Sequence, residues 1–334
     1  MNTMRPYPIK FDPILKEKIW GGQKLNAILG KQTNSNAVGE SWEISDVGGN
    51  VSVVSNGDYK GASLKALIAN YKADFVGKNN FKTFGYNFPL LIKFLDAQSD
   101  LSVQVHPDDA MAEKYHNSFG KTEMWYIMDS DESASIVIGL KDENANPDIL
   151  NHINEDNVAS VFNREQVKKG DSYFIPAGKI HAIGAGVLAA EIQQTSDITY
   201  RVYDWDRTDD AGQKRELHTQ LAEKATKSFP SNGKAAYNLE QVSYANLVSC
   251  DYFTTNILEV KKQMRKDYTN LDSFVIFMCV EGTADITVGS YKEHLKTGET
   301  ILVPAVTTAV MVESSSAKLL EVYIDPKSKP THLN

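Results

Sequence analysis

Two segments of this sequence, residues 170–177 and 298–305, repeat one pattern and so limit the folds that the chain can adopt. They read GDSYFIPA and GETILVPA, so glycine, acidic, hydroxyl, apolar, proline and alanine positions recur in register. Copies that begin at residues 170 and 298 are too far apart for a solenoid repeat and have the spacing of a duplicated domain. The repeat therefore predicts two related structural units in one chain.

Short runs rich in β-branched and aromatic residues dominate the chain and predict an all-β fold with a few helices. The clearest runs are residues 51–54, 124–128, 135–138, 274–278 and 319–324. Turn dipeptides such as Asn56-Gly57 and Glu281-Gly282 separate strand candidates. The predicted core is therefore built mainly from strands.

Three segments favour helices. Ser63 precedes apolar residues at 64, 67, 68 and 71, which lie on one face of a capped helix. Residues 107–116 begin with proline and two acidic residues, which suit the first turn of a short helix. Asn146-Pro147 is typical of a helix start, and we expect that segment to run to about Phe162.

The polar stretch 228–236 predicts a boundary between an N-terminal domain, residues 1–235, and a C-terminal domain, residues 236–334. After the repeated pattern the first copy continues GKIH and ends at His181, whereas the second continues VTTA and ends at Ala309. The histidine is therefore present in one copy only. We expect two β-barrels, of which the first holds a site and the second is empty.

The composition excludes some classes of function. With 334 residues, 42% hydrophobic and 23% charged, the chain is typical of a soluble globular protein. A net charge of −8 argues against nucleic-acid binding and means that an anionic substrate needs a local group of Lys and Arg. No long apolar run or leader suggests a membrane segment. Cys250 and Cys279 are expected to be buried reduced thiols, which favours the cytoplasm.

A candidate metal site begins on the strand-like segment 102–106. Alternate strand residues share a face, so Ser102, Gln104 and His106 point the same way. With Glu123 and His181 they supply two imidazoles, a carboxylate and an amide oxygen, which suit Zn²⁺ or another borderline divalent metal. Each histidine taken alone is more often a structural group than a ligand. The combination favours a metal centre, and the missing thiolates argue against a purely structural zinc site.

Several motifs resemble those of a known enzyme family. The pattern of Gly170, Pro176, Gly178 and His181 resembles the second cupin motif. The segments 19–22 (IWGG), 39–42 (GESW), 104–108 (QVHPD), 123–126 (EMWY) and 194–197 (QTSD), with Arg201 after the last, resemble signature blocks of type I mannose-6-phosphate isomerases. The likeness runs in order from about residue 10 to residue 325 and is to the short bacterial form.

The resemblance implies two cupin barrels, of the double-stranded β-helix or jelly-roll type, with the second degenerate. It implies a zinc-dependent aldose–ketose isomerase that interconverts mannose 6-phosphate and fructose 6-phosphate, with one Zn²⁺ per chain. The implied metal ligands are Gln104, His106, Glu123 and His181. The implied catalytic residues are Arg201, Glu191 and Lys121, and substrate binding is expected from Lys93, Ser102 and Trp20. The expected partner is a small phosphorylated sugar, with neither nucleic acid nor membrane, and the expected state is a monomer or weak homodimer.

Other interpretations remain open from the residues alone. Lys93 lies among apolar residues and needs a buried partner, whereas Arg201 precedes a charged run, 203–207, that offers structural ion pairs. The group that removes the substrate proton is open between Glu191, a zinc-bound water and a lysine. His106, Glu123 and His181 also match the facial triad of an Fe(II) dioxygenase. A sugar-phosphate sensor without turnover is the third possibility.

Overall fold

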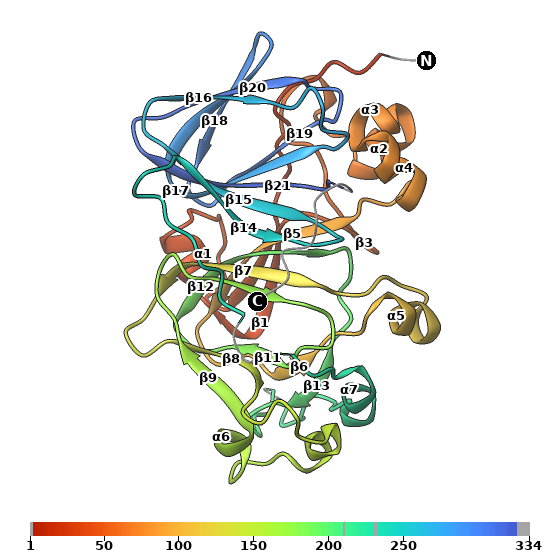
Figure 1. The fold of residues 1–334 in the computed structure, drawn as a ribbon, viewed down its shortest axis with the longest axis vertical. Helices are drawn as coiled ribbons and strands as arrows, with labels where there is room; N and C mark the ends of the chain where they lie inside the picture. Colours follow the sequence, from red (N-terminus) through yellow and green to blue (C-terminus); the bar gives the residue numbers. More distant parts are fainter. Residues whose placement is uncertain (1–2, 210, 230–232, 326–334) are drawn as a thin grey trace.

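The computed structural model describes residues 3–209, 211–229 and 233–325 and consists mostly of β-strands in three main sheets (Figure 1). The six-stranded sheet has the order β1 (Ile14–Gly22), β2 (Val38–Ile44), β5 (Leu90–Ala97), β12 (Val187–Gln194), β7 (Glu123–Ser130) and β10 (Ser172–Ile175). The five-stranded sheet has the order β13 (Tyr200–Tyr203), β6 (Val103–Val105), β11 (His181–Ile183), β8 (Ser135–Leu140) and β9 (Phe162–Gln166).

The C-terminal sheet has eight strands. Its main path is β14 (Tyr244–Ser249), β15 (Thr254–Val260), β21 (Ala317–Tyr323), β17 (Val275–Val288), β20 (Ala309–Glu313) and β16 (Gln263–Asp267), and β18 (Tyr291–Lys296) and β19 (Thr300–Val303) also pair with β17. The strands β3 (Asp46–Val47) and β4 (Asn50–Val51) form a small hairpin.

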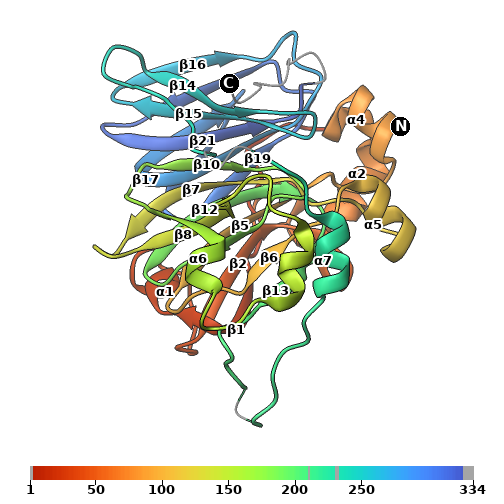
Figure 2. The ribbon, with the colours of Figure 1, turned by 60° about the horizontal axis from the view of Figure 1, so that its bottom comes forward.

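The helices are short. They are α1 (Lys24–Ala27), α2 (Leu64–Tyr71), α3 (Ala73–Val76), α4 (Lys78–Phe84), α5 (Asp109–His116), α6 (Val158–Val161) and α7 (Thr219–Ala225), with the 3₁₀ turns η1 (Gly57–Tyr59) and η2 (Pro147–His152). The helix α7 packs with η2 on the outer face of the five-stranded sheet, where Ala222 and Leu150 join its buried apolar cluster (Figure 2). Among the described residues, no helix combines the length and apolar composition needed to span a membrane.

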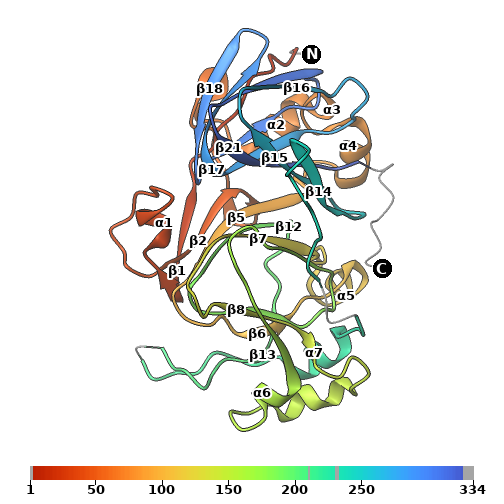
Figure 3. The same cartoon turned by 60° about the vertical axis from the view of Figure 1, so that its left-hand side comes forward.

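The six-stranded sheet lies between the other two sheets (Figure 3). Along β5 the side chains alternate, so Ile92 and Phe94 face the C-terminal sheet, where they join a core with Ile276. Lys93 and Leu95 point to the opposite face, toward the five-stranded sheet. This alternation explains why β5 is buried along its whole length although it carries a lysine. The inner face of the sandwich is where the polar site is built.

The two halves of the chain share a strand order. The neighbours β5–β12–β7–β10 in the N-terminal half correspond to β15–β21–β17–β19 in the C-terminal half. Likewise β6–β11–β8–β9 corresponds to β16–β20–β17–β18, because β17 is long enough to serve in both sets. The repeated sequence segments form β10 and β19, and each begins after a glycine with positive φ, Gly170 or Gly298. The predicted relation between the two segments therefore appears in the strand pairing.

Two predicted helices are confirmed with their caps. The Ser63 hydroxyl accepts a hydrogen bond from the Ala66 amide at 3.2 Å and starts α2. The Asp108 carboxylate accepts from the Met111 amide at 2.9 Å and starts α5. Most predicted strand runs are also confirmed to within one residue, as parts of β7, β8, β17 and β21. Cys250 and Cys279 are buried free thiols, as expected.

Two local predictions are wrong. The segment 146–162 is not one helix but the turn η2 followed by α6, because the Asn154 side chain accepts hydrogen bonds from the amides of Asp156 and Asn157 and forms a turn between them. Residues 51–54 are not a regular strand, since only residue 51 lies in β4 and residues 53 and 54 make isolated bridges. Part of the expected domain boundary, residues 230–232, lies outside the described residues.

Candidate active site

Strand register brings the predicted site residues to one interior space. On the six-stranded sheet Lys93 of β5 pairs with Glu191 of β12, which pairs with Trp125 of β7. On the facing five-stranded sheet Gln104 of β6 pairs with both His181 of β11 and Arg201 of β13. Two independent rows of side chains therefore point into the same space from opposite walls.

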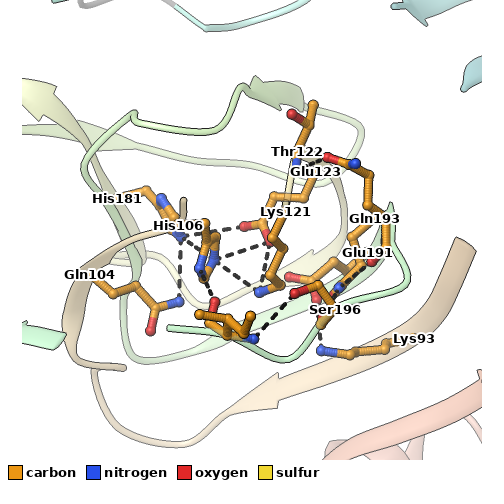
Figure 4. Close-up of polar contacts among 12 residues, drawn as sticks. Lys93, Gln104, His106, Lys121, Thr122, Glu123, His181, Glu191, Gln193 and Ser196 are labelled. Carbon is orange, nitrogen blue, oxygen red and sulfur yellow. Dashed lines mark hydrogen bonds and ion pairs between the residues drawn. The ribbon is translucent and has the colours of Figure 1, made fainter. Parts of the chain in front are cut away.

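Two histidines and one carboxylate meet at the centre of this space (Figure 4). The Nε2 atoms of His106 and His181 are 3.1 Å apart. Each lies 3.4 Å from a different oxygen of Glu123. All three side chains are at most 1% exposed. Among the described residues, neither Glu123 oxygen has a hydrogen-bond partner of good geometry. Two buried carboxylate oxygens beside two facing imidazole nitrogens are a donor set that suits a divalent cation.

Backbone carbonyls fix the orientation of both rings. His106 Nδ1 lies 2.9 Å from the Ile198 carbonyl, and His181 Nδ1 lies 2.8 Å from the Lys179 carbonyl. A proton on Nδ1 satisfies these contacts and leaves Nε2 with its lone pair toward the centre. Burial and then the Lys121 charge lower the pKa of His106 to about 3, and burial also lowers the pKa of His181. Both rings are therefore neutral, which is the form that binds metals.

Glu123 is ionised. Burial opposes its charge, but the nearby Lys121 ammonium and the two imidazoles outweigh that effect and hold the pKa of Glu123 well below its ordinary value. Lys121 Nζ lies 3.0 Å from Glu123 Oε2 and 2.9 Å from His106 Nε2. Lys121 is itself buried and lines the adjacent cavity. Its positive charge therefore acts both on the cluster and on the space where a substrate would lie.

Gln104 completes the predicted ligand set from the next strand. Its amide Nε2 lies 3.3 Å from His181 Nε2, while its Oε1 accepts from the Ser102 hydroxyl at 3.4 Å. A half-turn of the terminal amide exchanges the two atoms and presents the oxygen to the cluster. The residues present therefore fit a single divalent cation with two nitrogen and two oxygen ligands.

A second buried group lies beside the cluster. Lys93 Nζ is 3.1 Å from Glu191 Oε1 and 4.0 Å from Glu40 Oε2, and the Trp125 indole donates to Glu191 Oε2 at 2.9 Å. Burial raises the pKa of Glu191, and the Glu123 charge adds to this, whereas Lys93 opposes it. A buried carboxyl group whose pKa is raised by its surroundings is suited to proton transfer.

A cavity of about 460 Å³ opens onto these groups. Its wall includes Trp20, Lys93, Ser102, Gln104, Lys121, Glu191 and Arg201, so the predicted catalytic and substrate-binding residues share one space with the ligand strand. His106, Glu123 and His181 lie behind this wall, in the buried interior. Lysine and arginine outnumber acidic residues on the described wall, which gives an acidic protein the local positive field that an anionic substrate needs. The size is that of a small-molecule site.

Several residues of the cavity wall are not among the predicted site residues. Lys16 and Lys18 of β1 and Trp42 of β2 line it, as do Glu40, Asn50, Asp197, Thr199 and Arg215. The alternation of Lys16, Lys18 and Trp20 along one strand is a signal that a search for strand faces can find. Gly39 also contributes, since a Cβ at that position would lie 2.6 Å from the Trp20 ring. No comparable local pattern marks Arg215, which lies in the connection between β13 and α7.

Comparison with known proteins gives the family. A model of the type I phosphomannose isomerase catalytic domain matches residues 9–149, and a model of the mannose-6-phosphate isomerase cupin domain matches residues 243–324. The chain is 36% identical over 299 residues to the mannose-6-phosphate isomerase of Streptococcus mutans, covering 89% of this chain and 92% of that protein. The chain belongs to the type I phosphomannose isomerase family. It is therefore an isomerase, as its motifs suggested.

Other relatives agree with this assignment. The mannose-6-phosphate isomerase ManA of Bacillus subtilis is 35% identical over 305 residues, covering 90% of this chain and 94% of that protein. A crystal structure of the Bacillus subtilis mannose 6-phosphate isomerase superposes with a TM-score of 0.85 at 33% identity, covering 95% and 99% of the two chains. A phosphomannose isomerase variant from Salmonella typhimurium has a TM-score of 0.79 at 16% identity, covering 95% and 99%, and shares the fold.

Proposed function

We propose that this protein is a zinc-dependent aldose–ketose isomerase that interconverts mannose 6-phosphate and fructose 6-phosphate through an enediol. One observation carries the proposal: a buried His106–Glu123–His181 cluster lies behind the wall of a cavity, and that wall is rich in lysine and arginine. The cluster suits a Lewis-acidic metal, and the cationic wall suits a phosphorylated sugar. The family assignment agrees with both requirements.

The proposed cofactor is one Zn²⁺ per chain, held by Gln104, His106, Glu123 and His181. Zinc bound there would polarise the sugar carbonyl and stabilise negative charge without redox chemistry. The buried imidazoles are neutral and the carboxylate is ionised, so the donor set matches that ion in charge and softness.

The remaining residues perform the proton transfers and hold the sugar in this proposal. Glu191 Oε1 and Lys93 Nζ, 3.1 Å apart, can pass a proton between them, which lets the pair take a proton from one sugar carbon and return it to the next. The Lys121 ammonium favours the developing oxyanion. Ser102 and Trp20 line the space for the sugar, and Arg201 orients the substrate from the opposite wall.

The proposed architecture is a pair of cupin barrels, residues 1–235 and 236–334, with a degenerate second barrel. The shared strand order supports the duplication. By the register of the two repeats, Glu123 of β7 corresponds to Val275 of β17, and His181 corresponds to Ala309. Both replacements remove a metal ligand, and Val275 lies in the apolar core of the C-terminal half. We also propose that the protein is located in the cytoplasm and that it is a monomer or a weak homodimer.

Proton NMR in D₂O tests both the reaction and its route. We expect mannose 6-phosphate to be converted to fructose 6-phosphate, with deuterium from the solvent appearing at C1 of the product, because an enediol exchanges its proton with the base. Glucose 6-phosphate serves as the epimer control. Because the base can return the same proton, the sample is kept at equilibrium through many turnovers, and a complete lack of deuterium in the product after that time would contradict the enediol and favour a hydride shift. Absence of conversion by a protein with bound zinc would overturn the proposed function and favour a redox cupin or a sensor.

A further inference from the structure

Glu40 is a buried carboxylate of the cavity wall that takes no part in the proposed proton transfers. It lies on β2, between β1 and β5 in the sheet. Its Oε1 lies 3.3 Å from Lys18 Nζ, and its Oε2 lies 4.0 Å from Lys93 Nζ. The Trp42 indole donates a hydrogen bond to Oε2 at 2.6 Å, which fixes the plane of the carboxylate. Glu40 is therefore held beside Lys93 by contacts from three strands.

Glu40 is ionised and gives Lys93 a second anionic partner. Burial opposes its charge, but the Lys93 and Lys18 ammoniums and the Trp42 hydrogen bond outweigh that effect and lower the pKa of Glu40. Lys93 is buried as well, and Glu191 Oε1 approaches its Nζ to 3.1 Å from β12, whereas Glu40 approaches from β2 on the other side of β5. One buried cation is therefore shared by two carboxylates.

The second carboxylate matters when Glu191 takes a proton from the sugar. Glu191 then becomes a neutral acid, and the Lys93–Glu191 pair gains one positive charge. A buried ammonium whose partner has been neutralised is strongly destabilised. Glu40 stays ionised through this step and balances the added charge. Glu40 therefore lowers the cost of the state in which Lys93 is an ammonium and Glu191 holds the proton that it must return to the next sugar carbon.

No other carboxylate of the described part of the cavity is placed for this task. Besides Lys18 and Glu40, the charged side chains around the pair come from β1, from the start of β7 and from the far wall, and they are Lys16, Lys121, Glu123, Asp197, Arg201 and Arg215. Glu123 is paired with Lys121 and belongs to the metal cluster. Among the described residues, the ion pairs of Lys93 are those with Glu191 and Glu40. Glu40 is therefore the carboxylate that can balance Lys93.

We propose that Glu40 is a positioning residue of the isomerase, whose carboxylate holds Lys93 as an ammonium while Glu191 carries the proton taken from the sugar. The inference rests on the proposed function, since it concerns the same proton transfer. Glu40 acts through Lys93 and is not required to contact the sugar. The two anions are held in the same way, because the Trp125 indole donates to Glu191 as the Trp42 indole does to Glu40. Two fixed carboxylates with one shared lysine form the proton-transfer unit.

Two glutamates of β2 provide matched variants. Glu43 is buried like Glu40 and is paired with a lysine, Lys31, at 2.7 Å, but it lines a separate cavity. We expect Glu40→Gln to lower kcat by about tenfold or more, because a charge near the reacting groups is lost, and to leave KM within about twofold. Glu43→Gln should leave both constants within about twofold of the wild type. A kcat that is unchanged in Glu40→Gln, or that falls equally in Glu43→Gln, would overturn the role of Glu40.

The pH profile of kcat separates this role from a merely structural one. Burial lowers the pKa of Lys93, but the charges of Glu191 and then Glu40 outweigh that effect and raise it. Burial raises the pKa of Glu191, and the charges of Glu123 and Glu40 add to this. Removing the Glu40 charge should lower both pKa values, so both limbs of the profile should move to lower pH by about half a unit or more in Glu40→Gln. Limbs that stay at their wild-type positions would overturn the proposal, because a loosened β2 lowers kcat without moving them.

Carbon-13 NMR of lysine labelled at Cε measures the charge of Lys93 without turnover, so it separates this inference from the proposed function. The zinc-loaded wild type and Glu40→Gln are titrated, with Lys93→Arg to assign the signal. Lys93 should remain an ammonium to about pH 10 in the wild type and lose its proton at lower pH in Glu40→Gln. The same titration in both proteins would overturn the proposal, even if the wild type does not isomerise mannose 6-phosphate. If Glu40→Gln is poorly folded, the change is made together with Lys18→Met, which removes the cation that Glu40 leaves unpaired, and is compared with Lys18→Met alone.

Discussion

Lys93 and Glu191 lie directly opposite each other on neighbouring strands, and their side chains form a buried ion pair with an Nζ–Oε1 distance of 3.1 Å. The pair lies on the same face of the six-stranded sheet as Glu123, and both side chains line the cavity. Its register is set by the pairing of β5 with β12, so the two side chains are placed by the fold and not by a loop. The arrangement predicts a proton-transfer role for the pair.

Glu191→Gln tests that role. Glutamine has nearly the same shape and can still accept from the Trp125 indole, but it cannot take a proton. We expect kcat to fall by about 100-fold or more, with KM and bound zinc unchanged, because proton transfer by a placed side chain contributes about that factor. Steady-state kinetics with metal analysis of the same sample makes the measurement. A variant with wild-type kcat would exclude Glu191 from proton transfer.

The geometry of the His106–Glu123–His181 cluster predicts that His181 is needed for metal binding. His181→Ala removes a buried ligand whose Nε2 faces His106 and Glu123, so bound zinc should fall to background while the fold persists. His294→Ala is the matched control, since that imidazole is largely exposed and bonded to Asp285. Elemental analysis after dialysis gives the zinc content of each variant. Full zinc content in His181→Ala would remove this residue from the site.

Asp204 predicts a dependence of stability on pH. Burial opposes its charge, but hydrogen bonds from Arg215 and Arg207 outweigh this and hold the pKa of Asp204 below its ordinary value of 3.8. A carboxylate with a lowered folded pKa stabilises the protein above its unfolded pKa, and this contribution is lost as pH falls through the folded pKa. Asp204→Asn should therefore have a lower Tm than the wild type at neutral pH.

The difference in Tm between wild type and Asp204→Asn should narrow below about pH 4, where the unfolded chain takes up a proton and the folded carboxylate does not. Thermal melts from about pH 3 to 7 measure the difference. A gap that stays constant over this range would show that the Asp204 charge does not stabilise the fold.

A contact between the two halves of the chain predicts that truncating one of its side chains will greatly lower the stability of the protein. Phe88, next to β5, packs on Phe274, next to β17, with ring centroids 4.6 Å apart, and both side chains are fully buried. Phe274→Ala should lower the free energy of unfolding by about 3–5 kcal/mol through the cavity that it leaves. The metal ligands are not touched, so zinc content should not change. Chemical denaturation measures the loss, and a change under about 1 kcal/mol would mean that the contact is not important for stability.

Much of the fold and the candidate site could be predicted because strand periodicity is local information. Gln104 and His106 are two residues apart and so share a face, and the repeated glycine–proline pattern by itself marks the segments that form β10 and β19. The caps at Ser63 and Asp108 are also local, since each side chain accepts a hydrogen bond from an amide three residues later.

The remaining features depend on contacts between distant residues. The position of Arg215 follows from its bonds to Asp204 and from the path of residues 215–218 along β13, which no local pattern encodes. The partners of Lys93 come from β12 and β2, far away in the chain. The break between η2 and α6 arises because asparagine side chains there accept hydrogen bonds from backbone amides. It is hard to predict from the sequence because this local competition is a weaker signal than the helix start at Asn146.

The most direct test of the account is the zinc dependence of mannose 6-phosphate turnover by the purified protein. Isomerase activity should disappear when a chelator removes the metal and return when one equivalent of Zn²⁺ per chain is added, in step with the measured zinc content. Magnesium should not restore activity, because two imidazole ligands suit a borderline metal. Full activity in protein shown to be free of metal would contradict the account.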